Sequence, residues 1–252
     1  MDKAGSLNRA STILAAIARG SSRGSLLTEL ILRTGLPRTT VVRTLENLLE
    51  LGWVRRTHQG TRFNLGLDLA GLGFSAISRN PLERIASIEL TQLAEKLDQM
   101  VYLAIRSNLD MVCIGRYECK SDIQIGRGGV GLRGPFGMTQ SCMGMMARLP
   151  QEEVNAIIEA NLPRYYRIEG FDENGFRRTV KAAQKNGYGT FDNIILDRTT
   201  SGLGVAIVDP LGYPIAGIGT TYLTGWLDEA GQEECLMELK QAAVNIESKL
   251  FR

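Results

Sequence analysis

Residues 35 to 45 of the chain read Gly35-Leu36-Pro37-Arg38-Thr39-Thr40-Val41-Val42-Arg43-Thr44-Leu45. Glycine at the start can adopt the positive φ that ends a helix, and Pro37 suits the first turn of the next helix, where its missing N–H costs nothing. Apolar residues then recur at helical spacing, namely Val41, Leu45, Leu48 and Leu49. The run therefore predicts a tight turn followed by a helix from about Pro37 to Leu51.

The segment before this turn carries the pattern of two further helices. Ser6 can cap the first, whose apolar residues at helical spacing are Leu7, Ala10, Ile13, Leu14 and Ile17. A polar loop at residues 21–24 follows, and the second helix is predicted from about Leu26 to Arg33. Three helices of which the last two are joined by a short glycine turn form a helix-turn-helix.

The residues after Gly52 predict a β-hairpin, or wing. Residues 53–57 and 61–65 are its strands, and His58 is a polar residue of the turn rather than a catalyst. The exposed start of the preceding helix presents guanidinium and hydroxyl groups, which can contact guanine, thymine methyls and phosphates from the major groove. The predicted DNA-binding residues are Arg38, Thr39, Thr40 and Arg43 on the helix, with Arg55, Arg56 and Arg62 of the wing along phosphates or a minor groove.

The charge is unevenly distributed along the chain. Residues 1–66 hold ten basic and four acidic residues, whereas the rest of the chain holds nineteen basic and twenty-three acidic ones. A basic segment on a mildly acidic body favours contact with a polyanion through the first part. A solvated surface would give the same composition, so charge alone leaves both interpretations open.

These residues resemble the IclR family of bacterial transcription regulators. The matching motifs are the run at residues 35–45, Leu51-Gly52-Trp53-Val54, and the wing exit Arg62-Phe63-Asn64-Leu65-Gly66. The resemblance implies a winged helix-turn-helix at residues 1–66 and a linker helix at residues 67–80 that helps the DNA-binding domains to pair. It also implies an effector-binding and oligomerisation domain at residues 81–252, with a GAF-like α/β architecture and an antiparallel sheet.

The larger region has its own pattern, which predicts an α+β domain. Its predicted strands cover residues 100–106, 110–117, 122–125, 204–208 and 213–221, mostly joined by hairpin turns. Its predicted helices cover residues 82–99, 151–160, 173–185 and 228–251. In the first of these helices the residues expected to face inward are Ile85, Ile88, Leu93, Ala94 and Leu97.

A helix that begins near Thr139 is the predicted start of an effector site, because its N-terminal N–H groups and dipole favour a carboxylate. The predicted residues are Met138, Thr139, Gln140, Ser141, Cys142 and Met143, with Asp197, Thr199, Thr200 and Ser201 opposite, and with space for a ring beside Gly217 and Gly219. The family's lysine is replaced here by Met143 and its usual histidine by Gly137. We therefore expect an aromatic or similarly hydrophobic monocarboxylic acid from a catabolic pathway, although core packing explains the methionines equally well.

Several kinds of chemistry are disfavoured by residue counts. One histidine cannot supply a histidine-rich zinc site, and none of the four cysteines forms a C-x-x-C pair. The two overlapping G-x-G-x-x-G patterns within residues 126–134 are followed by Pro135 and lie in no βαβ unit, which favours a glycine-rich surface loop over a dinucleotide site. We expect neither a cofactor nor a metal.

The sequence thus predicts a transcription regulator that binds double-stranded operator DNA under the control of a small-molecule effector. Two alternatives remain, a DNA-binding protein without a ligand and an enzyme that uses the C-terminal domain. We expect a homodimer or homotetramer in the cytoplasm, with no membrane association, and contact with RNA polymerase if the protein activates transcription. No export signal and no apolar run of membrane-spanning length is seen.

Overall fold

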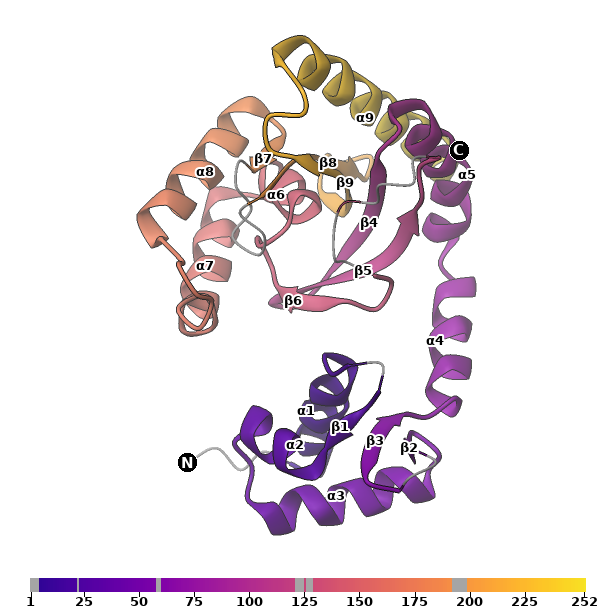
Figure 1. The fold of residues 1–252 in the computed structure, drawn as a ribbon. Helices are drawn as coiled ribbons and strands as arrows, with labels where there is room; N and C mark the ends of the chain where they lie inside the picture. The colour runs from indigo at the N-terminus through magenta and orange to yellow at the C-terminus, as the bar shows by residue number, and fades with distance from the viewer. Residues whose placement is uncertain (1–4, 22, 58–59, 121–124, 126–128, 192–198) are drawn as a thin grey trace. The chain divides into compact units, whose positions relative to one another are not determined.

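The computed structural model describes residues 5–21, 23–57, 60–120, 125, 129–191 and 199–252 (Figure 1). The chain forms two compact units, residues 1–80 and residues 81–252. Within the described residues no helix combines the length and apolar character needed to cross a membrane. The predicted strand at residues 122–125 and the first part of the glycine-rich loop fall largely outside the described residues.

The first unit is a winged helix-turn-helix followed by one more helix. Its helices are α1 (Ser6–Ala18), α2 (Leu27–Thr34), α3 (Arg38–Glu50) and α4 (Asp68–Ser78). Its strands β1 (Ser25–Leu26), β2 (Val54–Arg56) and β3 (Arg62–Leu65) form an antiparallel sheet in the order β1-β3-β2. Gly35 ends α2 with φ 66°, as the sequence predicts, and Pro37 is the residue directly before the first turn of α3.

The core of the first unit lies between α1, α2, α3 and the sheet. Its fully buried residues include Ile13 of α1, Leu30 of α2 and Val41 of α3, each with 0% exposure. Val54 and Phe63 close the core from the hairpin side. The short strand β1 was not predicted, because two residues carry no strand pattern of their own and pair only through Phe63 and Arg62 of β3.

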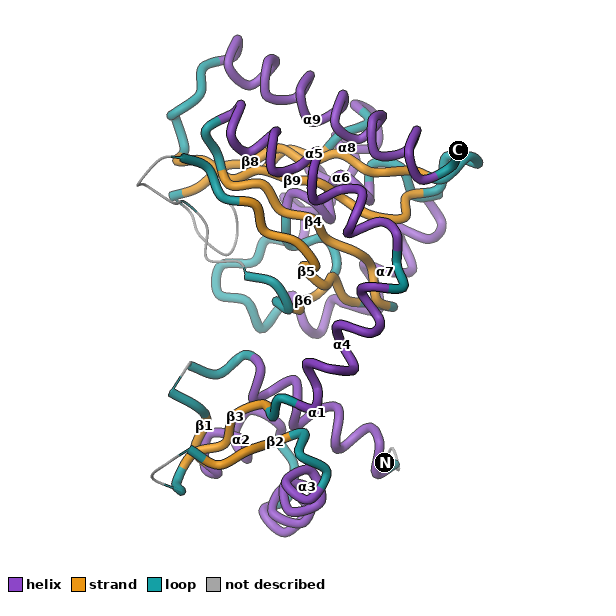
Figure 2. Tube along the Cα trace, turned by 90° about the vertical axis from the view of Figure 1, so that its right-hand side faces the viewer, coloured by secondary structure: helices purple, strands orange, loops and turns teal. Residues whose placement is uncertain are grey.

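The second unit is a six-stranded antiparallel sheet with helices on both faces (Figure 2). Its helices are α5 (Pro81–Leu97), α6 (Gln140–Met146), α7 (Gln151–Tyr165), α8 (Glu173–Asn186) and α9 (Glu229–Leu250). Its strands are β4 (Met100–Ser107), β5 (Asp110–Tyr117), β6 (Arg133–Pro135), β7 (Gly189–Phe191), β8 (Thr200–Val208) and β9 (Pro214–Leu223). The strand order is β6-β5-β4-β9-β8-β7.

Two apolar clusters cover the two faces of this sheet. Leu90 of α5 and Leu239 and Ile246 of α9 pack on one face. Met143 and Met146 of α6 pack with α7 and α8 on the other. The predicted α+β class and antiparallel sheet are therefore confirmed.

Several local predictions for the second unit were wrong: β8 begins at Thr200 rather than at residue 204, and strand β7 was not predicted. Ile88, expected to face inward, is 62% exposed, because Ala86 and Leu90 occupy the inward face of α5. Residues 133–135 form the edge strand β6 within the predicted surface loop, paired with β5. Helix α7 continues past Ala160 to Tyr165, with Pro163 inside it.

Candidate functional site

The N-terminal half of α3 presents a polar surface because its apolar residues are held in the core. Val41, Leu45 and Leu48 are at most 2% exposed, which fixes the rotation of the helix. Arg38, Thr39 and Arg43 are consequently exposed, while Thr40 is half-buried. Four predicted residues thus occupy the first two turns of one helix, and three of them are open to solvent.

The hairpin adds two exposed arginines beside the C-terminal end of α3 (Figure 1). Arg55 and Arg56 are both on β2. The Arg56 guanidinium lies 5.1 Å from the centroid of the Phe63 ring, and its Nη1 donates to the Gly60 carbonyl at 3.2 Å. These contacts hold Arg56 along the hairpin.

Arg62 has a different environment from the other hairpin arginines. Its Nη1 donates to the Gly24 carbonyl at 2.8 Å and lies 3.8 Å from Glu29 Oε1. Glu29 Oε2 in turn accepts from the Leu26 N–H at 3.1 Å at the start of α2. Arg62 therefore connects β3 to the loop at Gly24 and to helix α2, in addition to carrying a positive charge.

A groove of about 270 Å³ lies between α3 and the hairpin. Val42, Glu46 and Leu49 line it from α3, and Arg56 and Phe63 line it from the hairpin. Glu46 was not among the predicted site residues, although its position three residues after Arg43 places it near the same exposed helix surface. A carboxylate there can accept a hydrogen bond from cytosine N4.

Helix α6 begins at the predicted effector segment. Thr139 caps it by accepting from the Cys142 N–H at 3.4 Å. The neighbouring predicted residues Met138, Gln140, Ser141, Cys142 and Met143 are all buried, with exposures of 7% or less. Burial raises the pKa of the Cys142 thiol to about 11, so the thiol stays protonated near neutral pH.

Backbone contact explains this burial. A Cβ built on Gly217 would lie 2.0 Å from the Ser141 carbonyl oxygen, and one on Gly204 would lie 1.9 Å from the Gln140 carbonyl oxygen. Strand glycines therefore let the backbone of α6 rest directly on β8 and β9. The space expected beside Gly217 and Gly219 for a ligand ring is filled by α6.

Polar contacts continue from α6 across the sheet. Gln140 Nε2 donates to Thr221 Oγ1, and Ser201 Oγ lies 2.9 Å from Thr224 Oγ1. Thr200 is buried and Thr199 is exposed. Asp197 lies outside the described residues.

A cavity of about 120 Å³ adjoins Thr221, at the end of β4 and β9. Its lining includes Gln99, Met100, Cys119 and Trp226. The sequence did not indicate these four residues, because they come from two bends, a loop and the first residue of β4, which share no motif. Among the described residues no cluster of three or more His, Cys, Asp or Glu side chains could hold a metal ion.

A winged helix-turn-helix with an exposed arginine- and threonine-bearing recognition helix, on the same chain as an α+β domain, defines a DNA-binding protein. The C-terminal domain model of the bacterial transcriptional regulator IclR matches residues 74–248, and the IclR helix-turn-helix domain model matches residues 6–58. The chain belongs to the IclR family of bacterial transcriptional regulators.

Relatives and solved structures agree with this membership. The HTH-type transcriptional regulator KipR of Bacillus subtilis is 25% identical over 89% of each chain. KdgR of Dickeya chrysanthemi is 25% identical over 92% of this chain and 76% of its own. The IclR-type regulator of Alicyclobacillus acidocaldarius has a TM-score of 0.79 and 23% identity over 97% of this chain and 98% of its own. An IclR homologue from Microbacterium hydrocarbonoxydans, solved with 4-hydroxybenzoate, has a TM-score of 0.73 and 20% identity over 98% and 99%.

Proposed function

We propose that the first unit binds operator DNA with α3 in the major groove and the hairpin along the backbone. The observation that carries the proposal is the exposure of Arg38, Thr39 and Arg43 on a helix whose opposite side is locked into the core. Thr40 would contact phosphate from the edge of this surface. Arg55 and Arg56 would contact phosphates, and Arg62 would both contact phosphate and hold the hairpin in place.

Alanine at Arg38 or Arg43 tests the base contacts. Each change should weaken binding to a selected operator by about 1–3 kcal/mol and relax the base preference at one position. Arg55→Ala should instead weaken binding to all sequences. It should also make the slope of log K against log[salt] less steep, by the contribution of about one phosphate contact. Mobility-shift titrations at several fixed salt concentrations measure both quantities.

The matched control is Arg148→Ala, which removes an exposed arginine from the second unit. It should bind the operator like the wild type. If Arg38→Ala, Arg43→Ala and Arg55→Ala all behaved like Arg148→Ala, the assignment of α3 and the hairpin would be wrong.

We further propose that the second unit binds a small-molecule effector and that binding shifts the population between arrangements with different operator affinity. An aromatic or similarly hydrophobic monocarboxylic acid is the proposed class. The cavity beside Thr221 and the 4-hydroxybenzoate in the Microbacterium homologue support it. Gln140 and Thr221 would lie nearest the ligand. The other predicted residues of α6, β8 and β9 would pack behind these two and hold them in position.

Helix α4 is the proposed linker helix and self-association element of a homodimer or homotetramer. Leu67, Leu72 and Phe74, in or next to it, are 82%, 57% and 70% exposed. Residues 1–66, 67–80 and 81–252 would then act as DNA-binding, linker and effector-binding parts. We also propose that the protein acts in the cytoplasm and that, if it activates transcription, it contacts RNA polymerase.

An enzymatic role is the weaker alternative. The relatives reported above are transcriptional regulators, and the buried Cys142 thiol has the raised pKa of an inert cysteine.

A further inference from the structure

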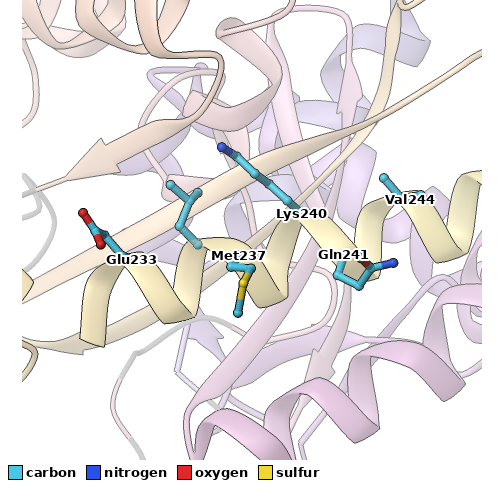
Figure 3. Close-up of a pocket in the computed structure, with 6 residues that line it drawn as sticks. Glu233, Met237, Lys240, Gln241 and Val244 are labelled. Atoms are coloured by element: carbon cyan, nitrogen blue, oxygen red, sulfur yellow. The ribbon is translucent and has the colours of Figure 1, made fainter. Parts of the chain in front are cut away.

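Helix α9 carries an exposed stripe on the side away from the sheet (Figure 3). The stripe consists of Glu233, Leu236, Met237, Lys240, Gln241 and Val244, and a shallow groove of about 390 Å³ runs along it. Leu236 is half-buried against the core of the unit, and the other five side chains are exposed. Met237 and Val244 are 59% and 55% exposed. The stripe therefore offers apolar surface between charged side chains, in a pattern that repeats every three to four residues.

The charges of α9 are divided between its two halves. Residues 228–239 contain five acidic residues and no basic one, whereas residues 240–252 contain three basic residues and one acidic one. Two parallel copies of this helix would place like charges together. Two antiparallel copies would place the acidic half of each against the basic half of the other.

One antiparallel register brings the apolar residues of the two stripes together and also places opposite charges against each other. If two copies cross between Leu236 and Met237, these side chains meet at the two-fold axis. Glu233 and Lys240 lie on either side of that point, each about 5 Å along the helix at 1.5 Å per residue. Glu233 of each copy then faces Lys240 of the other, which gives two symmetric ion pairs flanking an apolar centre.

The position of Lys240 suits this arrangement. Its ammonium lies 5.0 Å from the centroid of the Tyr188 ring, which holds the side chain over the surface beside α9. Glu238 and Lys249, by contrast, form ion pairs with Lys96 and Glu89 of α5. The charged side chains that pair with α5 and the charged side chains of the stripe therefore lie on different sides of α9.

We propose that this stripe is a self-association surface, on which α9 pairs antiparallel with α9 of a second copy of the chain. A single crossing of two helices buries less surface than a stable dimer usually needs. The α9 pair would therefore join copies that already associate through another surface.

Charge exchange tests this pairing in the full-length protein. Glu233→Lys places two lysines opposite each other, and Lys240→Glu places two glutamates opposite each other. Each single variant should weaken association through α9 by about tenfold or more and halve the molar mass measured by sedimentation equilibrium. An equimolar mixture of the two variants should recover the wild-type mass, because only mixed pairs bring lysine against glutamate at both contacts.

Glu234→Lys is the matched control, since it makes the same charge change one residue away and outside the stripe. It should retain the wild-type mass. The proposal is overturned if Glu233→Lys and Lys240→Glu keep the wild-type mass across the concentration range, or if Glu234→Lys loses mass equally. It is also overturned if the mixture of the two single variants fails to reassociate.

Discussion

At the scale of single residues, the glycines of β8 and β9 determine how the second unit is built. Gly204 and Gly217 are the points where the backbone of α6 meets the sheet, and Gly144 faces Val205 from the helix side. A side chain at any of these positions would have to displace backbone, which cannot rotate away as a side-chain tip can. We expect these glycines to be more sensitive to substitution than the apolar residues around them.

Gly217→Ala should lower the free energy of unfolding by about 1–3 kcal/mol, the range for overpacking a core, because its Cβ would lie 2.0 Å from the Ser141 carbonyl oxygen. Urea denaturation followed by circular dichroism measures the change. Gly134→Ala on β6 is the control, since a Cβ there meets nothing within 4 Å. Equal stability of the two variants would mean that α6 does not rest on β9 as described.

At the scale of elements, α4 stands apart from the other helices of the first unit. Leu72 and Phe74 are largely exposed, and Gly71 and Gly73 leave its surface open to close approach by another helix. A glycine-containing helix with exposed apolar residues gains its stability from packing rather than from propensity.

Leu72→Glu and Phe74→Glu should therefore reduce self-association and, with it, the cooperative binding of a pseudo-palindromic operator. Light scattering should give half the wild-type molar mass for the double variant. Leu7→Glu replaces a still more exposed leucine on α1 and should change neither quantity. If the double variant kept the wild-type molar mass, the copies would not associate through α4.

Elements with local signals were predictable from the sequence, and elements defined by distant partners were not. The turn at Gly35, the helix α3 and both hairpin strands follow from adjacent glycine, proline and apolar spacing, and their ends agree within two residues. Strands β1 and β6 are two and three residues long and exist only through pairing with β3 and β5. The lining of the cavity beside Thr221 was likewise unpredictable, because Gln99, Cys119 and Trp226 meet only in the folded sheet.

At the scale of the whole molecule, the proposed effector binding and the operator binding would influence each other by the same factor. Calorimetry with benzoate and 4-hydroxybenzoate, compared with pyruvate and glyoxylate, should show binding only of the aromatic acids. The bound acid should then change operator affinity by about 5- to 150-fold, the usual range for such coupling. Thr221→Val should weaken acid binding, and Thr91→Val on the exposed side of α5 should not. Binding of pyruvate or glyoxylate alone would contradict the proposed class.

Helix α3 has one further consequence, for how such a regulator can diverge. Residues 41, 45 and 48 are buried in the core, while residues 38, 39 and 43 are exposed. Duplicated copies of the gene could therefore acquire new operators by exchanging the second set alone, without first acquiring a compensating mutation in the interior. The same partition makes the helix a convenient position for grafting a chosen DNA specificity onto an otherwise unaltered chain.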